Sequence, residues 1–326
     1  KGDDLVQNRS LKFPKNYFDD FYAFLDSYNF TTDESTSQYQ QVAIDPEMLG
    51  RIFENLLAEM TDESGEQARK AQGAFYTPRE IVDYMCRETL KKYLESALSP
   101  DAHLEQRLIQ LVDGSDREFQ DQDHNWRRDW KPYKEKLLIA LDELRILDPA
   151  CGSGAYPMGM LQLLLKVYDR LDSALGKDTY ALKLQIISNN LFGVDIEPMA
   201  VEISRLRAWL SLVVDLESEK KKIKPLPNLD FRFVCANSLI PLDISNLMMF
   251  GEDPELGLKL EEIRKQYFTT ESMVKKKKHR TAYEKLIFTD ASLFGESRRT
   301  SQLKSYHPFD TSTTSSFFDP EHMFGC

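Results

Sequence analysis

The chain has 326 residues, of which 42 are Lys or Arg and 53 are Asp or Glu, so its formal net charge is -11. This length predicts about two domains, and a content of 41% hydrophobic and 29% charged residues excludes a collagen, a mucin or a wholly disordered chain. The acidic balance argues against a general nucleic-acid coat, whereas an enzyme with a local basic cleft remains compatible with it.

The sequence also indicates the cellular compartment and whether a metal site is present. No apolar stretch approaches the roughly 18 residues of a membrane-spanning helix, and the N-terminus shows no secretory signal. Four cysteines, at positions 86, 151, 235 and 326, stand far apart, and the five histidines lack ligand spacing. We therefore predict no metal site and no membrane partner, and a cytoplasmic, reducing compartment is expected.

The N-terminal residues 1–72 are predicted to be a helical region. Asp45 and Pro46 have the pattern of a helix start, an N-cap followed by proline, and apolar residues repeat at helical spacing after them. A further helix is expected to begin at Pro78, directly after the compact turn Gly73–Pro78.

Residues 100–143 are predicted to form a helical insert outside any sheet. Leucines repeat at helical spacing in two parts of this stretch, at positions 104, 108 and 111 and again at 137, 138 and 141. We therefore expect two helices there and no strand.

Three strands are predicted after the insert. The apolar runs are Leu144–Asp148, Leu191–Asp195 and Phe231–Cys235, and the first two each lead through a turn into apolar residues at helical spacing. Strands that alternate with helices predict a parallel, doubly wound α/β sheet.

The sequence changes character again after residue 241. Residues 254–268 predict a helix, Lys275–Arg280 are a basic run, and the Ser- and Thr-rich residues 297–316 are expected to be mobile. The basic run is compatible with contacts to DNA phosphates, but a solvated helix face is the better interpretation. We divide the chain into a helical region at 1–72, a sheet region at 73–240 and a helical and flexible segment at 241–326.

The strongest chemical signal is the string Asp148-Pro-Ala-Cys-Gly-Ser-Gly154 between the first predicted strand and its helix. Small residues allow a tight turn and a close ligand approach, and open α/β sheets bind nucleotides at the carboxyl ends of their strands. The leading aspartate, without a phosphate-binding lysine, suits a ligand with a cationic amino group rather than a polyphosphate. S-adenosylmethionine, which has an amino group, a sulfonium and no phosphate, meets these demands. The alternative is a tight turn without a ligand.

Two further polar residues follow predicted strands. Asp195 ends the second strand and is placed to accept hydrogen bonds from both ribose hydroxyls, while Ile196 is free to pack on an adenine face. Asn237 follows the third strand and offers its amide to an adenine. Each polar residue has a plainer interpretation, Asp195 as a helix cap and Asn237 as a turn former.

Four segments together resemble the motifs of γ-class amino-group DNA methyltransferases. In order, Gly73–Pro78, Asp148–Gly154, Gly193–Pro198 and Ala236–Leu239 resemble motifs X, I, II and III. The flanking segment Asp45–Leu57 is similar to the Eco57I-like methylases of restriction–modification systems, as is the segment before the third strand. The resemblance covers about residues 12–245 and the last few residues. It implies a class I, Rossmann-like S-adenosylmethionine-dependent methyltransferase sheet, present in part.

The resemblance also implies a role for each site residue. Thr77, next to Tyr76, would hold the methionine carboxylate of the cofactor, and Asp148 with the turn Gly152–Gly154 would hold the methionine amino group and backbone. Asp195 would bind the ribose, Ile196 the adenine ring and Asn237 the adenine amino group, where the family more often has Asp. The predicted cofactor set is Tyr76, Thr77, Asp148, Pro149, Ala150, Gly152, Gly154, Asp195, Ile196 and Asn237.

The target-base motif of these enzymes, Asn/Asp-Pro-Pro-Tyr/Phe, is not in the chain, because no two of its 14 prolines are adjacent. The family places that motif shortly after a segment like Phe318–Gly325. We therefore expect a fragment that ends before its catalytic motif, with no catalytic residue of its own and no activity alone. The resemblance implies a full-length DNA adenine-N6 methyltransferase that acts on double-stranded DNA, with a target-recognition domain and a fused or associated nuclease.

Two other functions stay open. A related methyltransferase would use the same cofactor half on RNA or on a protein amide, and a DNA-recognition domain in the parent gene would argue against that. A non-catalytic fragment would use the sheet for DNA binding or assembly alone, which a titration with the cofactor would test.

Overall fold

The structure of the chain is a computed structural model. It describes residues 77–98, 104–115, 123–172, 178–218, 228–243, 254–270, 272–293, 298–310 and 312–325, with the single residues Asp20, Ala23, Gly50 and Ile52. The expectations for residues 1–72, apart from those four, and for Tyr76 lie outside the described residues.

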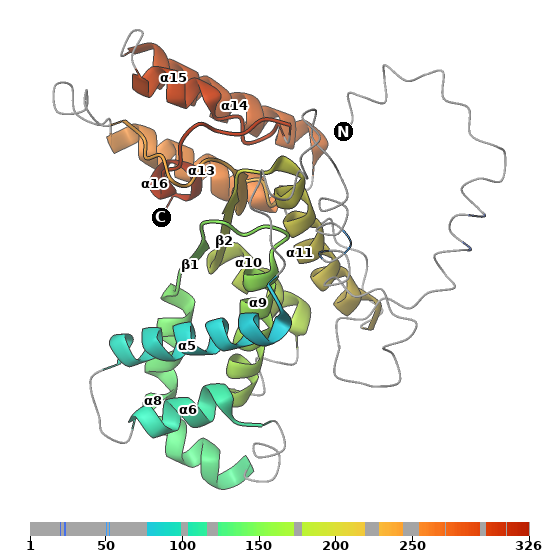
Figure 1. The fold of residues 1–326 in the computed structure, drawn as a ribbon, viewed down its shortest axis with the longest axis vertical. Helices are drawn as coiled ribbons and strands as arrows, with labels where there is room; N and C mark the ends of the chain where they lie inside the picture. Colours follow the sequence, from blue (N-terminus) through green and yellow to red (C-terminus); the bar gives the residue numbers. More distant parts are fainter. Residues whose placement is uncertain are drawn as a thin grey trace, which may run out of the picture.

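A small parallel sheet lies at the centre of the fold (Figure 1). Its strands β1 (Ile146–Asp148), β2 (Leu191–Asp195) and β3 (Phe233–Cys235) are hydrogen-bonded in the order β1-β2-β3. Asp148 lies opposite Gly193, and Asp195 lies opposite Cys235. The three predicted strands are confirmed. Parallel strands bury both faces, which explains why β2 is a nearly continuous apolar run.

The crossover helices form one apolar core with the sheet. α9 (Ala155–Leu171) and α10 (Thr179–Asn189) connect β1 to β2, and α11 (Pro198–Ser218) connects β2 to β3. Buried residues of α9 extend around most of the helix, and they share one core with the alternate strand residues Ile146, Leu191 and Phe233. The side chain of Asp178 caps α10 by accepting a hydrogen bond from the backbone amide of Ala181 at 3.0 Å.

The remaining strand residues meet a second group of helices. It consists of α13 (Pro254–Thr269), α14 (Met273–Leu293), α15 (Arg298–Ser305) and α16 (Pro320–Phe324). Phe192, Val194 and Val234 belong to its core, and the rings of Phe192 and Phe324 lie 4.9 Å apart. Residues 254–325 therefore cover the second face of β2 and β3, whereas Leu147 of β1 is exposed there.

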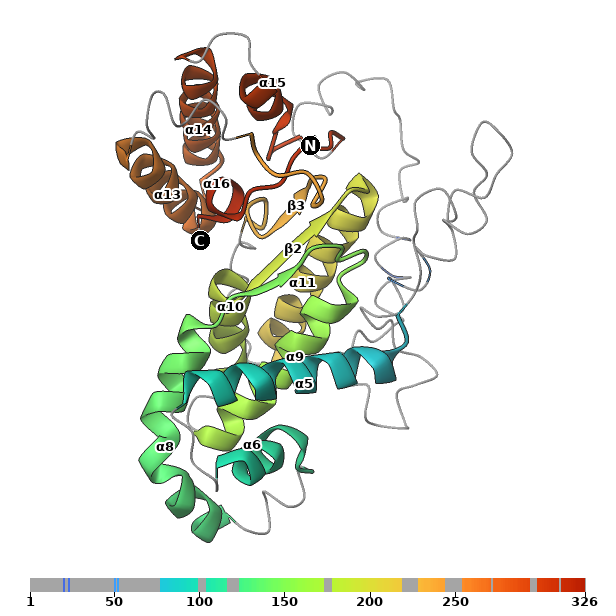
Figure 2. The same cartoon turned by 60° about the vertical axis from the view of Figure 1, so that its left-hand side comes forward.

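Three further helices lie at the opposite end of the molecule from α13–α16 (Figures 1 and 2). They are α5 (Arg79–Ala97), α6 (Leu104–Asp113) and α8 (Asp123–Glu143). Arg170 of α9 donates to the carbonyl of Leu111 at 2.6 Å, and the Tyr93 hydroxyl donates to the carbonyl of Ala140 at 2.8 Å. The described residues of 100–143 are helical, as expected, and include no strand.

The Ser- and Thr-rich stretch 297–316, which we expected to be mobile, is packed into the fold. Its described residues contain α15, and Leu303, Tyr306 and Ser315 are buried. Ser315 pairs in parallel with Ala236 beside β3, and Phe318 pairs with Pro241. The expectation is wrong because these scattered apolar side chains enter the core around α13 and α14, which the polar composition of the stretch concealed.

The described residues thus form a mixed α/β fold in which a parallel sheet has helices on both faces of β2 and β3. Among the described helices, none has the length and apolar character needed to cross a bilayer.

Candidate functional site

Three predicted site residues gather at the carboxyl edge of the sheet. Asp148 ends β1, Asp195 ends β2, and Asn237 follows β3 by two residues. Because the strands are parallel and adjacent, their carboxyl ends lie along one edge, where open α/β sheets bind ligands.

The glycine-rich turn after β1 requires glycine at two positions. Gly152 has a φ of +53° and Gly154 a φ of +84°, a left-handed conformation that side chains rarely adopt. A Cβ on Gly154 would lie 2.9 Å from Oγ and 3.3 Å from Cα of Ser204, so α11 approaches the turn closely there. A Cβ on Gly152 would meet no atom of the described residues within 4 Å, so the backbone at this position has a side that they leave open.

Hydrogen bonds from β2 and α11 fix the turn. The amide of Cys151 donates to the carbonyl of Val194, and the amide of Gly152 donates to Oδ2 of Asp195, each at 2.8 Å. The Ser204 hydroxyl donates to the carbonyl of Gly152 at 2.9 Å. Arg207 of α11 donates to the carbonyl of Ser153 at 2.8 Å. The turn is therefore rigid before any ligand arrives, which lowers the entropic cost of binding.

Asp148 is a half-buried carboxylate that no cation of the described residues pairs with. Burial raises the pKa of Asp148, the charge of Asp195 adds to the shift, and the hydrogen bond from the amide of Ala150, at 3.2 Å, opposes it. A desolvated carboxylate next to a second carboxylate favours a cationic ligand, because a positive charge would relieve both the burial penalty and the repulsion.

Asp195 holds the backbone on both sides of the sheet edge. Its Oδ2 accepts from the amide of Gly152, and its Oδ1 accepts from the amide of Glu197 at 2.9 Å. Because Glu197 precedes α11, Asp195 holds the turn that leads into this helix and does not cap its first turn. A carboxylate has about four acceptor sites. About two therefore remain for the ribose hydroxyls, which leaves that role a prediction.

The two residues predicted for adenine differ in their surroundings. Ile196 is 53% exposed at the end of β2, as a residue that packs on a ligand requires. Oδ1 of Asn237 accepts from the amide of Leu239 at 3.1 Å, so Asn237 acts as a turn former. Its interaction with adenine stays a prediction.

Thr77 lies two residues before α5, a helix that packs against α9. A Cβ on Gly159 of α9 would lie 2.6 Å from Val82 and 3.2 Å from the sulfur of Cys86, so α5 and α9 are in close contact at these residues. Burial, with smaller effects of Asp83 and Asp148, raises the pKa of Cys86 to about 12, so this thiol is a packing group. Thr77 is half-buried directly before this helix.

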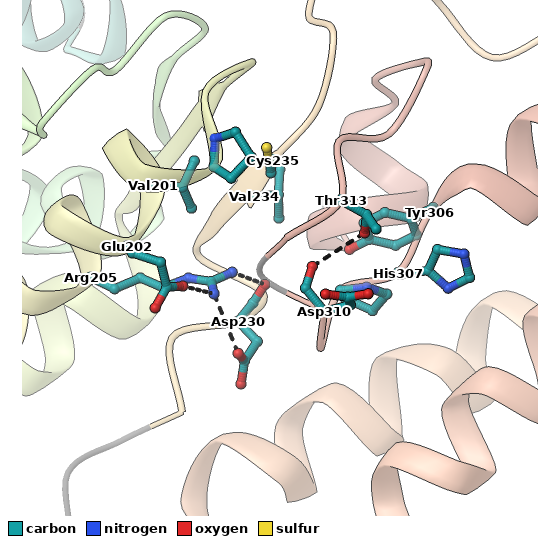
Figure 3. Close-up of a pocket in the computed structure, with 12 residues that line it drawn as sticks. Val201, Glu202, Arg205, Asp230, Val234, Cys235, Tyr306, His307, Asp310 and Thr313 are labelled. Carbon is teal, nitrogen blue, oxygen red and sulfur yellow. Dashed lines mark hydrogen bonds and ion pairs between the residues drawn. The ribbon is translucent and has the colours of Figure 1, made fainter. Parts of the chain in front are cut away.

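A separate cavity lies at the outer edge of β3, between α11 and residues 306–313 (Figure 3). Arg205, which is buried, donates to the carbonyl of Phe233 at 2.6 Å and lies 3.5 Å from Oδ1 of Asp230. The Arg205 charge is therefore compensated within the protein, and this cavity is not part of the predicted set.

The basic run lies away from the predicted site. Lys275, Lys277 and Lys278 are exposed on α14, as the solvated-face interpretation predicts. Burial lowers the pKa of Lys276, although the charge of Asp230 opposes this effect. Asp230 precedes β3, so the run lies near the amino ends of the strands, opposite Asp195.

Sequence reasoning missed the α11 residues that hold the turn. Ser204 and Arg207 are polar but buried on a helix that otherwise shows apolar periodicity. Polar residues on the inward face of such a helix are the signal that would have identified them.

Comparison with known proteins matches residues 189–319 to the model of the Eco57I restriction-modification methylase family. This part of the chain belongs to that family. The match begins two residues before β2 and includes α11, β3, α13–α15 and residues 312–318, so three of the four helices on the second face of the sheet, α13–α15, lie within it and α16 follows it.

Three relatives extend the comparison beyond the matched residues. A Methanocaldococcus jannaschii protein, named as a type II restriction enzyme and methyltransferase, is 34% identical over 67% of this chain and 18% of its own length. The adenine-specific methyltransferase PglX of Streptomyces coelicolor is 35% identical over 38% of this chain and 10% of its own. DNA methyltransferase A of Bacillus subtilis is 26% identical over 38% of this chain and 16% of its own length. The chain thus spans less than a fifth of each of these relatives.

Proposed function

We propose that this Eco57I-family chain is the S-adenosylmethionine-binding part of a restriction–modification DNA adenine-N6 methyltransferase, with a class I, Rossmann-like sheet. The observation that carries the proposal is the half-buried, partly desolvated carboxylate of Asp148 together with the open side of Gly152, at the carboxyl edge of a parallel sheet. This combination favours a small cationic ligand that approaches the backbone closely.

The residues present fit this cofactor. Asp148 would bind the methionine amino group, and the Gly152–Gly154 turn would lie against the methionine backbone. Asp195 would accept from the ribose hydroxyls, Ile196 would pack on the adenine, and Asn237 and Thr77 would bind the adenine amino group and the methionine carboxylate. Tyr76, Pro149 and Ala150 complete the proposed set. When bound, the cofactor supplies an electrophilic methyl group on its sulfonium.

The proposed substrate is adenine in double-stranded DNA. The names of the relatives support it, since they describe a type II restriction enzyme and methyltransferase, an adenine-specific methyltransferase and a DNA methyltransferase. The first name also supports a nuclease fused or associated with the methylase. A DNA substrate also supports a cytoplasmic location of the protein. The domain limits 1–72, 73–240 and 241–326, with the insert 100–143, remain part of this proposal.

The transfer step belongs, in this proposal, to the longer protein. Enzymes that modify a base extrude it and recover the unstacking cost through contacts in a pocket. The Pro-Pro motif that the resemblance assigns to these contacts is not among the 326 residues. RNA and protein-amide methylation remain the second candidate, because the cofactor half would be the same.

Calorimetric titration of the 326-residue protein with S-adenosylmethionine tests the cofactor assignment. We expect saturable binding by the wild type and about 10- to 100-fold weaker binding by Asp148→Asn, because a hydrogen bond to a charged group contributes about 1.5–3 kcal/mol. Asp83→Asn is the matched control, since Asp83 is exposed on α5 and pairs with Arg87. Equal affinity of the wild type and Asp148→Asn would refute the role of Asp148, and no binding by the wild type would refute the proposed function.

A labelling assay tests the substrate. Tritium-labelled cofactor is offered with mixed-sequence duplex DNA, RNA or protein to the chain and to a version extended beyond Cys326. We expect label in the adenines of DNA with the extended protein only. Label in RNA or protein instead would favour the second candidate.

A further inference from the structure

A strap of residues 312–318 is fixed along the end of β3. The amide of Ser315 donates to the carbonyl of Cys235, and the amide of Asn237 donates to the carbonyl of Ser315, each at 3.0 Å. The amide of Phe318 donates to the carbonyl of Ile240 at 2.8 Å. Ser315 and Phe317 are buried, so the strap is anchored at its middle and near its C-terminal end.

The strap reaches the residue that follows β2. The Thr314 hydroxyl donates to the carbonyl of Ile196 at 3.1 Å. The thiol of Cys235 donates to the same carbonyl at 3.5 Å, and its sulfur lies 3.3 Å from Oγ1 of Thr314. The Ile196 carbonyl is therefore held by side chains from two other segments, one of them 118 residues away.

These contacts fix the backbone on both sides of the exposed Ile196 side chain. Before it, the Asp195 carboxylate is held by the amides of Gly152 and Glu197. After it, Thr314 and Cys235 hold the carbonyl. The orientation of this peptide sets the direction of the Ile196 side chain, which rises 53% exposed from the carboxyl edge of the sheet. Ser315, the next strap residue, holds the backbone of Asn237.

We propose that Thr314 is a positioning residue for the adenine end of the cofactor, an inference that rests on the proposed function. Thr314 orients Ile196 through its carbonyl, while Ser315 fixes the backbone of Asn237. One short strap thus sets the two sides of the adenine subsite relative to each other, and Thr314 acts without touching the cofactor.

The test uses the 326-residue protein and S-adenosylhomocysteine, with dissociation constants from calorimetry. Thr314→Val keeps the side-chain shape and removes the hydroxyl, so we expect about three- to tenfold weaker binding. Thr314→Ser retains the hydroxyl and is expected to bind within about twofold of the wild type. Thr313→Val is the matched control, because the Thr313 hydroxyl donates only within the loop, to the carbonyl of Asp310 at 3.3 Å.

A double-mutant cycle separates positioning from a general weakening of the strap. If Thr314 acts through Ile196, Thr314→Val weakens binding in the wild type but not in the Ile196→Ala background. An equal loss in both backgrounds would assign Thr314 a structural role only and overturn the inference.

Different results would overturn the positioning role of Thr314 and the proposed cofactor-binding function. A wild type that binds S-adenosylhomocysteine, together with a Thr314→Val variant of equal affinity, would overturn the positioning role alone. A wild type that binds neither S-adenosylhomocysteine nor S-adenosylmethionine would overturn the proposed function and this inference with it.

Discussion

The backbone amide of Gly152 donates a hydrogen bond to Oδ2 of Asp195 at 2.8 Å, joining the turn after β1 to the end of β2. Gly152 is in the left-handed region, so the turn is held in a conformation that an isolated segment would populate only in part. The Asp195 side chain, which we propose binds the ribose, thus also holds the turn that we propose binds the methionine.

Removal of the Asp195 carboxylate is therefore expected to affect both stability and binding. Asp195→Ala should lower the free energy of unfolding by about 1–3 kcal/mol, because the amides of Gly152 and Glu197 lose their acceptor. Urea unfolding would measure this effect.

A ligand without the 2′-hydroxyl separates the two roles of Asp195. We expect the wild type to bind 2′-deoxy-S-adenosylhomocysteine more weakly than S-adenosylhomocysteine, and Asp195→Ala to bind the two alike. Equal discrimination by both proteins would remove Asp195 from the ribose while leaving its contact with the turn.

The surroundings of Gly152 and Gly154 differ, so alanine substitutions at the two positions are expected to differ in their effect on stability. Gly154→Ala places a Cβ 2.9 Å from Oγ of Ser204 in addition to its unfavourable φ, and should cost more than about 2 kcal/mol of stability. Gly152→Ala adds a Cβ in open space and should cost about 1 kcal/mol, the strain alone. Thermal unfolding with S-adenosylhomocysteine titrations would measure both, and a Gly152→Ala variant less stable than Gly154→Ala would contradict this account.

The parts of the fold that the sequence predicts are those with local signals. β2 was expected at Leu191–Asp195 and is found there, because an apolar run that ends in a polar residue before a helix has few alternatives. β1 and β3 begin two residues later than expected, at Ile146 and Phe233. Arg232 lies in a turn instead, where its amide donates to the carbonyl of Leu229.

The parts that escaped prediction depend on contacts distant in sequence. Ser315 lies in a polar stretch without strand periodicity, yet it pairs beside β3 with Ala236. Nothing local in Phe192 or Val194 indicates that helices from residues 254–325 would cover them. The carboxyl-edge positions of Asp148, Asp195 and Asn237 followed from the parallel strands, whereas the hydrogen bond from the backbone amide of Asn237 to the carbonyl of Ser315 could not be foreseen.

Cofactor affinity is expected to fall in mild acid. Burial raises the pKa of Asp148 above its ordinary value of 3.8, so its carboxylate gains a proton at a higher pH than a solvated aspartate does. A protonated Asp148 no longer attracts an amino group, so affinity should decrease as pH falls from about 7 toward that raised pKa. Titrations across this range should show the trend in the wild type and a flatter profile in Asp148→Asn. Matching profiles would mean that another group governs the pH dependence.

His322 of α16 has a buried Nε2 that no described residue hydrogen-bonds. Burial, with the charges of Arg264 and Arg299, lowers its pKa from 6.5 to about 3. Tyr306 and Phe317 pack against the ring, each with its ring centroid 6.1 Å from that of His322. Between these two pKa values the unfolded chain binds a proton that the folded chain excludes. The contribution of His322 to stability is therefore lost as pH falls below 6.5.

The expected size is about 1.4 kcal/mol per pH unit, or about 2 kcal/mol between pH 6.5 and about 5. His322→Phe keeps an aromatic ring between Tyr306 and Phe317 and removes the proton site, so the difference in unfolding free energy between wild type and variant should grow by this amount on acidification. The exposed His307→Phe is the control and should leave the slope of the wild type unchanged. Urea unfolding at pH values from about 7 to 5 measures all three proteins. Parallel slopes for the wild type and His322→Phe would show that the imidazole is solvated in the folded protein, contrary to the structure.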